Sequence, residues 1–80
     1  MRRSKIEINV AILETLINYG PMGLTKITYK ANINYSVLKE LMIKLVKNNL
    51  VEERKPKENV LVYAATPKAK LALLELKEIA

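Results

Sequence analysis

The sequence contains no cysteine, histidine or aspartate, and its only glycines are Gly20 and Gly23. Without cysteine the chain forms no disulfide and offers no thiolate, and without histidine it lacks imidazole metal ligands and the most common general base. Glutamate, lysine and tyrosine remain, but they form no cluster that suggests a catalytic site. Two glycines provide no glycine-rich phosphate loop. We therefore expect a protein that is not an enzyme and that uses no metal and no cofactor.

Long apolar runs are also missing. No segment approaches the roughly 20 apolar residues of a membrane span, and the first residues lack the apolar core of a signal peptide. We expect a soluble, cytoplasmic protein without membrane contact, folded as a single domain over residues 1–80. Because a chain of this size buries only about 60% of its unfolded surface, a partner subunit would add stability.

Positive charge is what the chain has in excess, with a formal net charge of +6. The segment from Thr25 to Lys47 holds five lysines against one acid, Glu40. Less than a third of the length therefore carries two-thirds of the excess charge. Such a concentration of positive charge indicates contact with phosphate groups.

A first helix is predicted from its ends. Ser4 and Glu7 form a capping box, which starts a helix near Lys5, and Gly20 ends this helix near Tyr19. The helix carries two apolar stripes, where a surface helix needs one. The first stripe consists of Ile6, Val10, Leu13 and Ile17, and the second of Ile8, Ile12 and Tyr19, with Ala11 and Thr15. Either the helix is central and covered on both sides by its own chain, or the second stripe meets another protomer.

Two further helices are predicted after a short connection. Pro21–Leu24 is a linker or a single edge strand, and Thr25 is expected to cap a second helix that ends near Ala31. Asn34 is expected to cap a third helix, from Tyr35 to about Asn48. One face of the third helix is apolar, with Leu38, Leu41, Met42, Leu45 and Val46, and the opposite face carries Ser36, Glu40, Ile43, Lys44 and Lys47. Such a helix packs with one side and presents the other.

A hairpin and a last helix complete the chain. Leu50–Arg54 and Val60–Ala65 are predicted strands, and Lys55–Asn59 is the predicted loop, because Pro56 disfavours a regular ladder. Thr66 is expected to cap a helix that runs close to Ala80, with Pro67 in its first turn. The main apolar stripe of this helix is Ala69, Ala72, Leu73, Leu76 and Ala80. Leu71 and Leu74 lie on its other side, which suggests a second buried contact.

The order of these elements predicts an α+β fold, mostly α, of the winged helix-turn-helix type. It comprises a three-helix core, a two-stranded wing and a C-terminal helix. In this architecture one helix lies in the major groove of DNA, the preceding helix braces against the backbone, and the hairpin reaches an adjacent groove.

The segment GLTKITYKANINYSVLKELMIKLVKNNLVE, followed by VYAATPKAK, resembles the small archaeal winged helix-turn-helix DNA-binding regulators and chromatin-associated proteins. The resemblance covers about Gly23–Lys70. It rests on a T-x-I-x-Y-x-A-N turn region, a leucine-spaced third helix and a Y-x-x-T junction, matched here by Thr25, Ile27, Tyr29, Ala31, Asn32, Tyr35, Leu38, Tyr63 and Thr66. Asn49 and Ala69 stand where the family commonly has glycine, and asparagine tolerates a left-handed conformation. The resemblance implies binding to double-stranded DNA, usually as a homodimer, and often transcriptional repression.

The candidate DNA-binding residues come from the second and third helices and the hairpin. They are Lys26, Lys30, Tyr35, Ser36, Lys39, Glu40, Lys44, Lys47, Arg54, Lys55 and Lys57. Each has a plainer interpretation: the lysines as solvated side chains, the hairpin cations as protection of a sheet edge, and Tyr35 as a core side chain. Glu40 either accepts a hydrogen bond from a cytosine or pairs with Lys44, four residues later.

The candidate dimer interface combines Ile8, Ile12, Tyr19, Leu71 and Leu74. The resulting hypothesis is a homodimeric DNA-binding protein in the nucleoid, acting as a repressor-like transcriptional regulator or a chromatin-type protein. The alternative is a winged-helix scaffold for protein–protein interaction, which would work through the apolar surfaces of its terminal helices. RNA binding is disfavoured, because four tyrosines without phenylalanine or tryptophan make a poor stacking platform.

Overall fold

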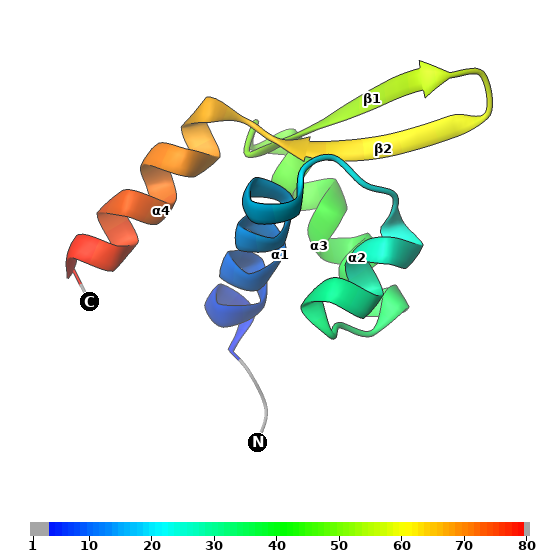
Figure 1. The fold of residues 1–80 in the computed structure, drawn as a ribbon. Helices are drawn as coiled ribbons and strands as arrows, with labels where there is room; N and C mark the ends of the chain where they lie inside the picture. Colours follow the sequence, from blue (N-terminus) through cyan, green and yellow to red (C-terminus); the bar gives the residue numbers. More distant parts are fainter. Residues whose placement is uncertain (1–3, 80) are drawn as a thin grey trace.

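The computed structural model describes residues 4–79, with side chains described as far as Glu75. Over these residues the elements are α1 (Lys5–Tyr19), α2 (Leu24–Ala31), α3 (Tyr35–Lys47), β1 (Val51–Lys57), β2 (Val60–Ala65) and α4 (Pro67–Ile79). Figure 1 shows α1 between α4 on one side and α2 and α3 on the other, with the hairpin projecting beyond the helices. The fold class and the element order predicted from the sequence are confirmed.

Helix α1 begins and ends where its local signals predict. The Ser4 hydroxyl accepts a hydrogen bond of 3.1 Å from the Glu7 amide, and the Glu7 carboxylate accepts one of 3.3 Å from the Ser4 amide. Gly20 ends the helix with φ at 86°, in the left-handed region that favours glycine. Within α1, Ile12 is completely buried and Leu16 joins the core, although Leu16 belongs to neither predicted stripe. The chain itself therefore covers this helix on more than one side.

The start of α2 corrects the predicted role of Thr25. The helix begins at Leu24, its N-cap is Gly23, and no side chain accepts a hydrogen bond from its first amides. The chain reaches α2 in an extended conformation at Gly23, so Thr25 already lies in the first turn and cannot cap it. Helix α2 ends at Ala31, and its C-cap Asn32, with φ at 55°, turns the chain toward α3.

Helix α3 follows the prediction closely. The Asn34 side chain accepts a hydrogen bond of 2.9 Å from the Ser36 amide, which is the predicted N-cap. The inner face of α3 is buried through Leu38, Leu41, Met42 and Leu45. These side chains pack in one core with residues of α1, α2, β1, β2 and α4.

The hairpin extends further than predicted. Strand β1 continues through Lys57, so the turn is formed by Glu58 and Asn59 instead of the longer basic loop. The register runs from Arg54 opposite Val62 to Lys57 opposite Val60, which leaves two residues of β1, including Pro56, facing one residue of β2. This bulge accommodates the proline, which has no amide hydrogen, without ending the strand.

The connection between α1 and α2 pairs with the wing. The Met22 amide donates to the Tyr63 carbonyl at 3.1 Å, and the Tyr63 amide donates to the Met22 carbonyl at 2.9 Å. Met22 therefore forms an isolated antiparallel bridge to β2, in line with the edge-strand interpretation of Pro21–Leu24.

Helix α4 starts with Pro67, and the Thr66 hydroxyl accepts a hydrogen bond of 3.3 Å from the Ala69 amide. Ala69 and Leu73 are buried, while Leu71 and Leu74 are exposed, as predicted. Ala80 and the side chain of Leu76 lie outside the part of the chain that the structure describes. None of the helices within residues 4–79 has the length and apolarity that crossing a membrane requires.

Candidate nucleic-acid interface

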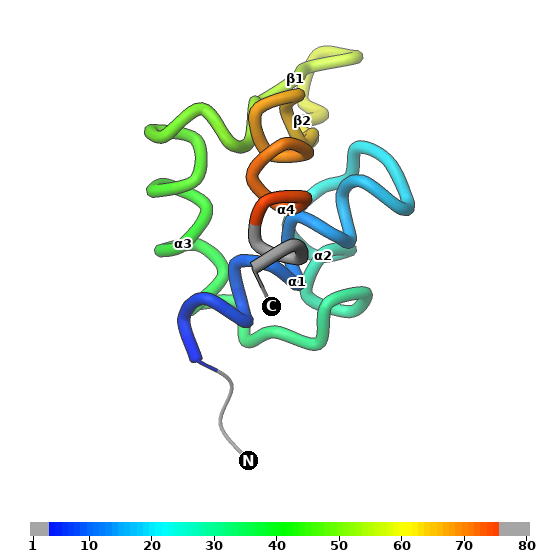
Figure 2. Tube along the Cα trace, turned by 90° about the vertical axis from the view of Figure 1, so that its left-hand side faces the viewer, coloured from blue at the N-terminus to red at the C-terminus, as the bar shows by residue number. Residues whose placement is uncertain are grey.

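The outer face of α3 is a continuous exposed surface. Ser36, Glu40, Ile43, Lys44 and Lys47 are all exposed, and a turn of about 100° per residue places them opposite the buried leucines. In the turned view of Figure 2, α3 runs along one edge of the molecule. The predicted division of this helix into a packed face and a presented face is therefore correct.

Helix α2 contributes further exposed cations beside α3. Lys26 and Lys30 are exposed, and Tyr29 between them is 82% exposed. The Lys30 ammonium lies 4.5 Å from the centre of the Tyr19 ring, a cation–π distance. Tyr19, the last residue of α1, therefore contacts Lys30 in the last turn of α2.

The first turn of α3 is organised by short-range contacts. The Ser36 hydroxyl donates a hydrogen bond of 2.7 Å to the Asn34 side chain, which also caps the helix. The Lys39 ammonium lies 5.9 Å from the centre of the Tyr35 ring. Tyr35 is half exposed, so its ring is not a core side chain.

Glu40 and Lys44 do not pair. Over the described residues the structure contains no ion pair between them, although their spacing of four residues allows one. Glu40 thus stands among lysines on the outer face of α3 without an ion pair in the described part of the chain. This arrangement leaves its oxygens available as acceptors.

The three predicted cations of the wing differ in their surroundings. The Arg54 guanidinium donates a hydrogen bond of 2.9 Å from Nε to the Glu52 carboxylate on the same strand, so part of its charge is neutralised. Lys55 and Lys57 are exposed, and neither forms an ion pair among the residues that the structure describes. The two lysines therefore carry the free positive charge near the hairpin turn.

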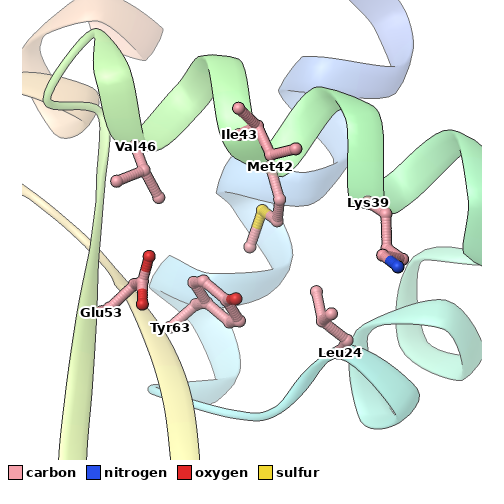
Figure 3. Close-up of a pocket in the computed structure, with 7 residues that line it drawn as sticks. All are labelled: Leu24, Lys39, Met42, Ile43, Val46, Glu53 and Tyr63. Atoms are coloured by element: carbon pink, nitrogen blue, oxygen red, sulfur yellow. The ribbon is translucent and has the colours of Figure 1, made fainter.

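A small cavity of about 100 Å³ lies between α3 and the wing (Figure 3). Its apolar lining comes from Leu24, Met42, Ile43 and Val46, and its polar lining from Lys39, Glu53 and Tyr63. Burial raises the pKa of Tyr63 above its ordinary value of 10.0, and the negative charge of Glu53, followed by that of the ionised Tyr35 phenolate, raises it further. Among the described residues no three carboxylates are grouped to hold a metal ion.

Sequence reasoning missed this cavity. Glu53 and Tyr63 are opposite each other in the hairpin register. A predicted pairing of β1 with β2 could therefore have shown that these two side chains lie close together. The position of Met42 and Val46 beside them depends on how α3 packs against the wing, for which the sequence contains no local signal.

The structure does not bring the predicted dimer residues together. Ile12 is 0% exposed and belongs to the core of the monomer, so no second chain can contact it. Tyr19 lies against Lys30 of α2, whereas the groove between α1 and α4 is lined by Ile17, about 160° around the helix from Tyr19, and by Asn18, about 100° from it. Ile8 is partly buried against the core. Leu71 and Leu74 remain exposed on α4, at 63% and 57%.

Several known structures share the fold of this chain. A DNA-binding protein from Sulfolobus solfataricus, Sso10a-2, superimposes with a TM-score of 0.82 at 28% identity, over 96% of this chain and 78% of that one. A MarR family transcriptional regulator from Silicibacter pomeroyi superimposes with a TM-score of 0.82 at 18% identity, over 94% of this chain. The present chain spans about half of that regulator, 51% of its length. Diamide-treated YodB from B. subtilis gives a TM-score of 0.70 at 20% identity, over 98% and 92% of the two chains.

No match was found among curated protein sequences. A sequence model of the winged helix-turn-helix family, in contrast, matches residues 2–80. The resemblance to archaeal winged helix-turn-helix proteins is confirmed by this match and by the likeness to Sso10a-2. Together with the helix order, the two-stranded wing and the exposed third helix, it identifies the chain as a member of the winged helix-turn-helix family.

Proposed function

We propose that this protein binds double-stranded DNA, with the outer face of α3 in the major groove, and that it acts as a repressor-like transcriptional regulator or a chromatin-type protein. The observation that carries the proposal is the surface of α3. Its lysines are exposed and project from a helix whose other side is buried through Leu38, Leu41, Met42 and Leu45. The names of the structural neighbours, a DNA-binding protein and a transcriptional regulator, support the same function.

The other predicted contacts take supporting roles in this proposal. Lys26, Lys30, Tyr35 and Lys39 contact the phosphate backbone from α2 and the start of α3, which positions the protein without reading sequence. Ser36 and Glu40 reach base edges from the outer face of α3. Arg54, Lys55 and Lys57 approach the backbone or the minor groove from the wing. A protein with these contacts would reside in the cytoplasm on the nucleoid.

The test is the affinity for duplex DNA as a function of salt. We expect a plot of log affinity against log salt with a slope of several units, since each neutralised phosphate contributes about 0.9. Fluorescence anisotropy at four salt concentrations, on a defined duplex and on a single strand of the same sequence, measures this slope. Absence of duplex binding at low salt would reject the proposal and favour a protein-interaction scaffold.

We also propose a homodimer, in a form different from the one expected from the sequence alone. Leu71 and Leu74 are exposed on α4, and Leu74 lines the groove between α1 and α4 together with Ile17, Asn18 and Leu73. Pairing this face with the same face of a second chain would remove the leucines from water. Two-fold symmetry then places paired DNA half-sites about one helical turn, or roughly 34 Å, apart.

Sedimentation equilibrium tests the dimer. Leu74→Glu places a charge in the proposed contact and should produce a monomer. Leu61→Glu, a matched change on the wing where the leucine is also exposed, should leave the dimer intact. A wild-type protein that is monomeric at tens of micromolar would reject the dimer without affecting the proposal of DNA binding.

A further inference from the structure

Ile43 is an apolar side chain in an unusual place. It is 69% exposed, and it lies near the middle of the outer face of α3. One turn before it stand Lys39 and Glu40, and one turn after it stands Lys47, all of them exposed. A single exposed apolar residue is ordinary on a protein surface. An isoleucine surrounded by lysines at the centre of a presented helix face matches a partner that combines negative charge with an apolar group.

The packing of α3 gives Ile43 no role in the core. The inner face is filled by Leu38, Leu41, Met42 and Leu45. In Figure 3, Met42 projects from α3 toward Tyr63, whereas Ile43 lies on the outer side of the helix, farther from Tyr63. Ile43 lines the rim of the cavity but is not part of the buried core, so its side chain contributes little to folding.

The charges around Ile43 select the partner. Lys39, Lys44 and Lys47 favour a polyanion, and among the base edges of the major groove the only apolar group is the 5-methyl group of thymine. A β-branched side chain in a helix keeps essentially one χ1 rotamer. Ile43 therefore loses little side-chain conformational entropy when it contacts a partner.

We infer that Ile43 reads a thymine in the major groove by packing against its 5-methyl group. This inference rests on the proposed binding of α3 to DNA and adds a specificity-determining residue to it. The ligand feature is a 5-methylpyrimidine, so a 5-methylcytosine at the same position would also be accepted. Isoleucine cannot donate or accept a hydrogen bond, so the methyl group is the whole basis of discrimination at this base pair.

The experiment compares thymine with uracil, which differ only in the methyl group. A preferred duplex is selected with the wild-type protein, each thymine is replaced in turn by deoxyuridine, and affinities are measured by fluorescence anisotropy. We expect one position per half-site at which the replacement weakens binding about fourfold, the effect of leaving one methyl group unburied. Ile43→Ala should bind thymine and uracil duplexes equally at that position, with an unchanged salt slope.

Val37→Ala is the matched control, because Val37 is 39% exposed on the same helix but points about 120° away from Ile43. It should keep the discrimination between thymine and uracil. If wild type binds duplex DNA but no uracil replacement matters, or if Ile43→Ala still discriminates, the inference is wrong while the proposed function stands. If wild type binds no duplex at all, the proposed function fails and this inference fails with it.

Discussion

The hydroxyl group of Thr66 donates a hydrogen bond of 2.6 Å to the backbone carbonyl of Asn49, which lies 17 positions earlier in the chain. The same hydroxyl oxygen accepts from the Ala69 amide at 3.3 Å, and the Thr66 amide donates to the Leu50 carbonyl at 3.1 Å. Thr66 thus connects the first turn of α4 to the segment between α3 and β1. Loss of the Thr66 side chain should destabilise the packing of α4 against the segment between α3 and β1.

Thr66→Ala should therefore lower the free energy of unfolding by about 1–2 kcal/mol, through loss of the cap and of a hydrogen bond between segments. Urea denaturation followed by circular dichroism measures the change. Thr25→Ala is the control, because Thr25 is exposed and caps no helix. It should change stability by less than about 0.5 kcal/mol. Equal losses in both variants would contradict the role assigned to Thr66.

The adjacent residues Asn48 and Asn49 differ in backbone conformation. Asn49 has φ at 62°, in the left-handed region, whereas Asn48 has φ at −90°. Asn49→Ala should cost about 1 kcal/mol of stability, because alanine does not stabilise this conformation as asparagine or glycine does. Asn48→Ala should cost clearly less, and Asn49→Gly should be close to neutral. Thermal unfolding of the three variants compares them, and a larger loss at Asn48 would be inconsistent with this reasoning.

The lysines near the end of α3 should set the salt dependence of DNA binding. Replacing Lys44 and Lys47 with alanine should lower the slope of log affinity against log salt by about 1.8 units, two phosphate contacts at about 0.9 each. Removing Lys5 and Lys68, exposed on α1 and α4, removes the same charge and should change the slope much less. Equal changes in both double variants would mean that the net charge of the protein, and not the position of the lysines on α3, sets the salt dependence of DNA binding.

The wing should strengthen binding without reading bases. Replacing Lys55 and Lys57 with alanine should weaken all duplex sequences by a similar factor, because phosphate contacts are independent of sequence. Glu58→Gln at the turn removes a repelling charge and should strengthen all sequences in the same way. A random duplex pool, sequenced before and after selection, detects any change. Altered sequence preference in the lysine variant would make the wing a reader of bases.

Glu40 should discriminate at one base pair if it reaches a cytosine amino group. Glu40→Ala should then lose about 1–3 kcal/mol of discrimination at that position, while non-specific affinity stays equal or rises. Selection with the wild type and the variant, followed by sequencing, provides the comparison. Identical preferences would mean that Glu40 reads no base, and a wild type without preference would favour the chromatin-type role.

Local features of the sequence determined the ends of α1 and α3 and the presented face of α3. Ser4, Glu7 and Asn34 satisfy free amides within a few residues of themselves, so their effect does not depend on distant parts of the chain. The period of apolar residues in α3 separates a buried from an exposed face for the same reason. The family resemblance to winged helix-turn-helix proteins followed from these local patterns taken in order.

Only the tertiary structure decided what lies against each exposed or apolar surface. Ile12 and Tyr19 share one stripe of α1 in the sequence, yet Ile12 is enclosed by the core and Tyr19 lies against Lys30 beyond it. The continuation of β1 past Pro56 depends on pairing with β2, whose register permits a bulge. Periodicity defines the face on which a side chain lies, whereas the neighbours of that face come from segments distant in the sequence, and their packing decides burial.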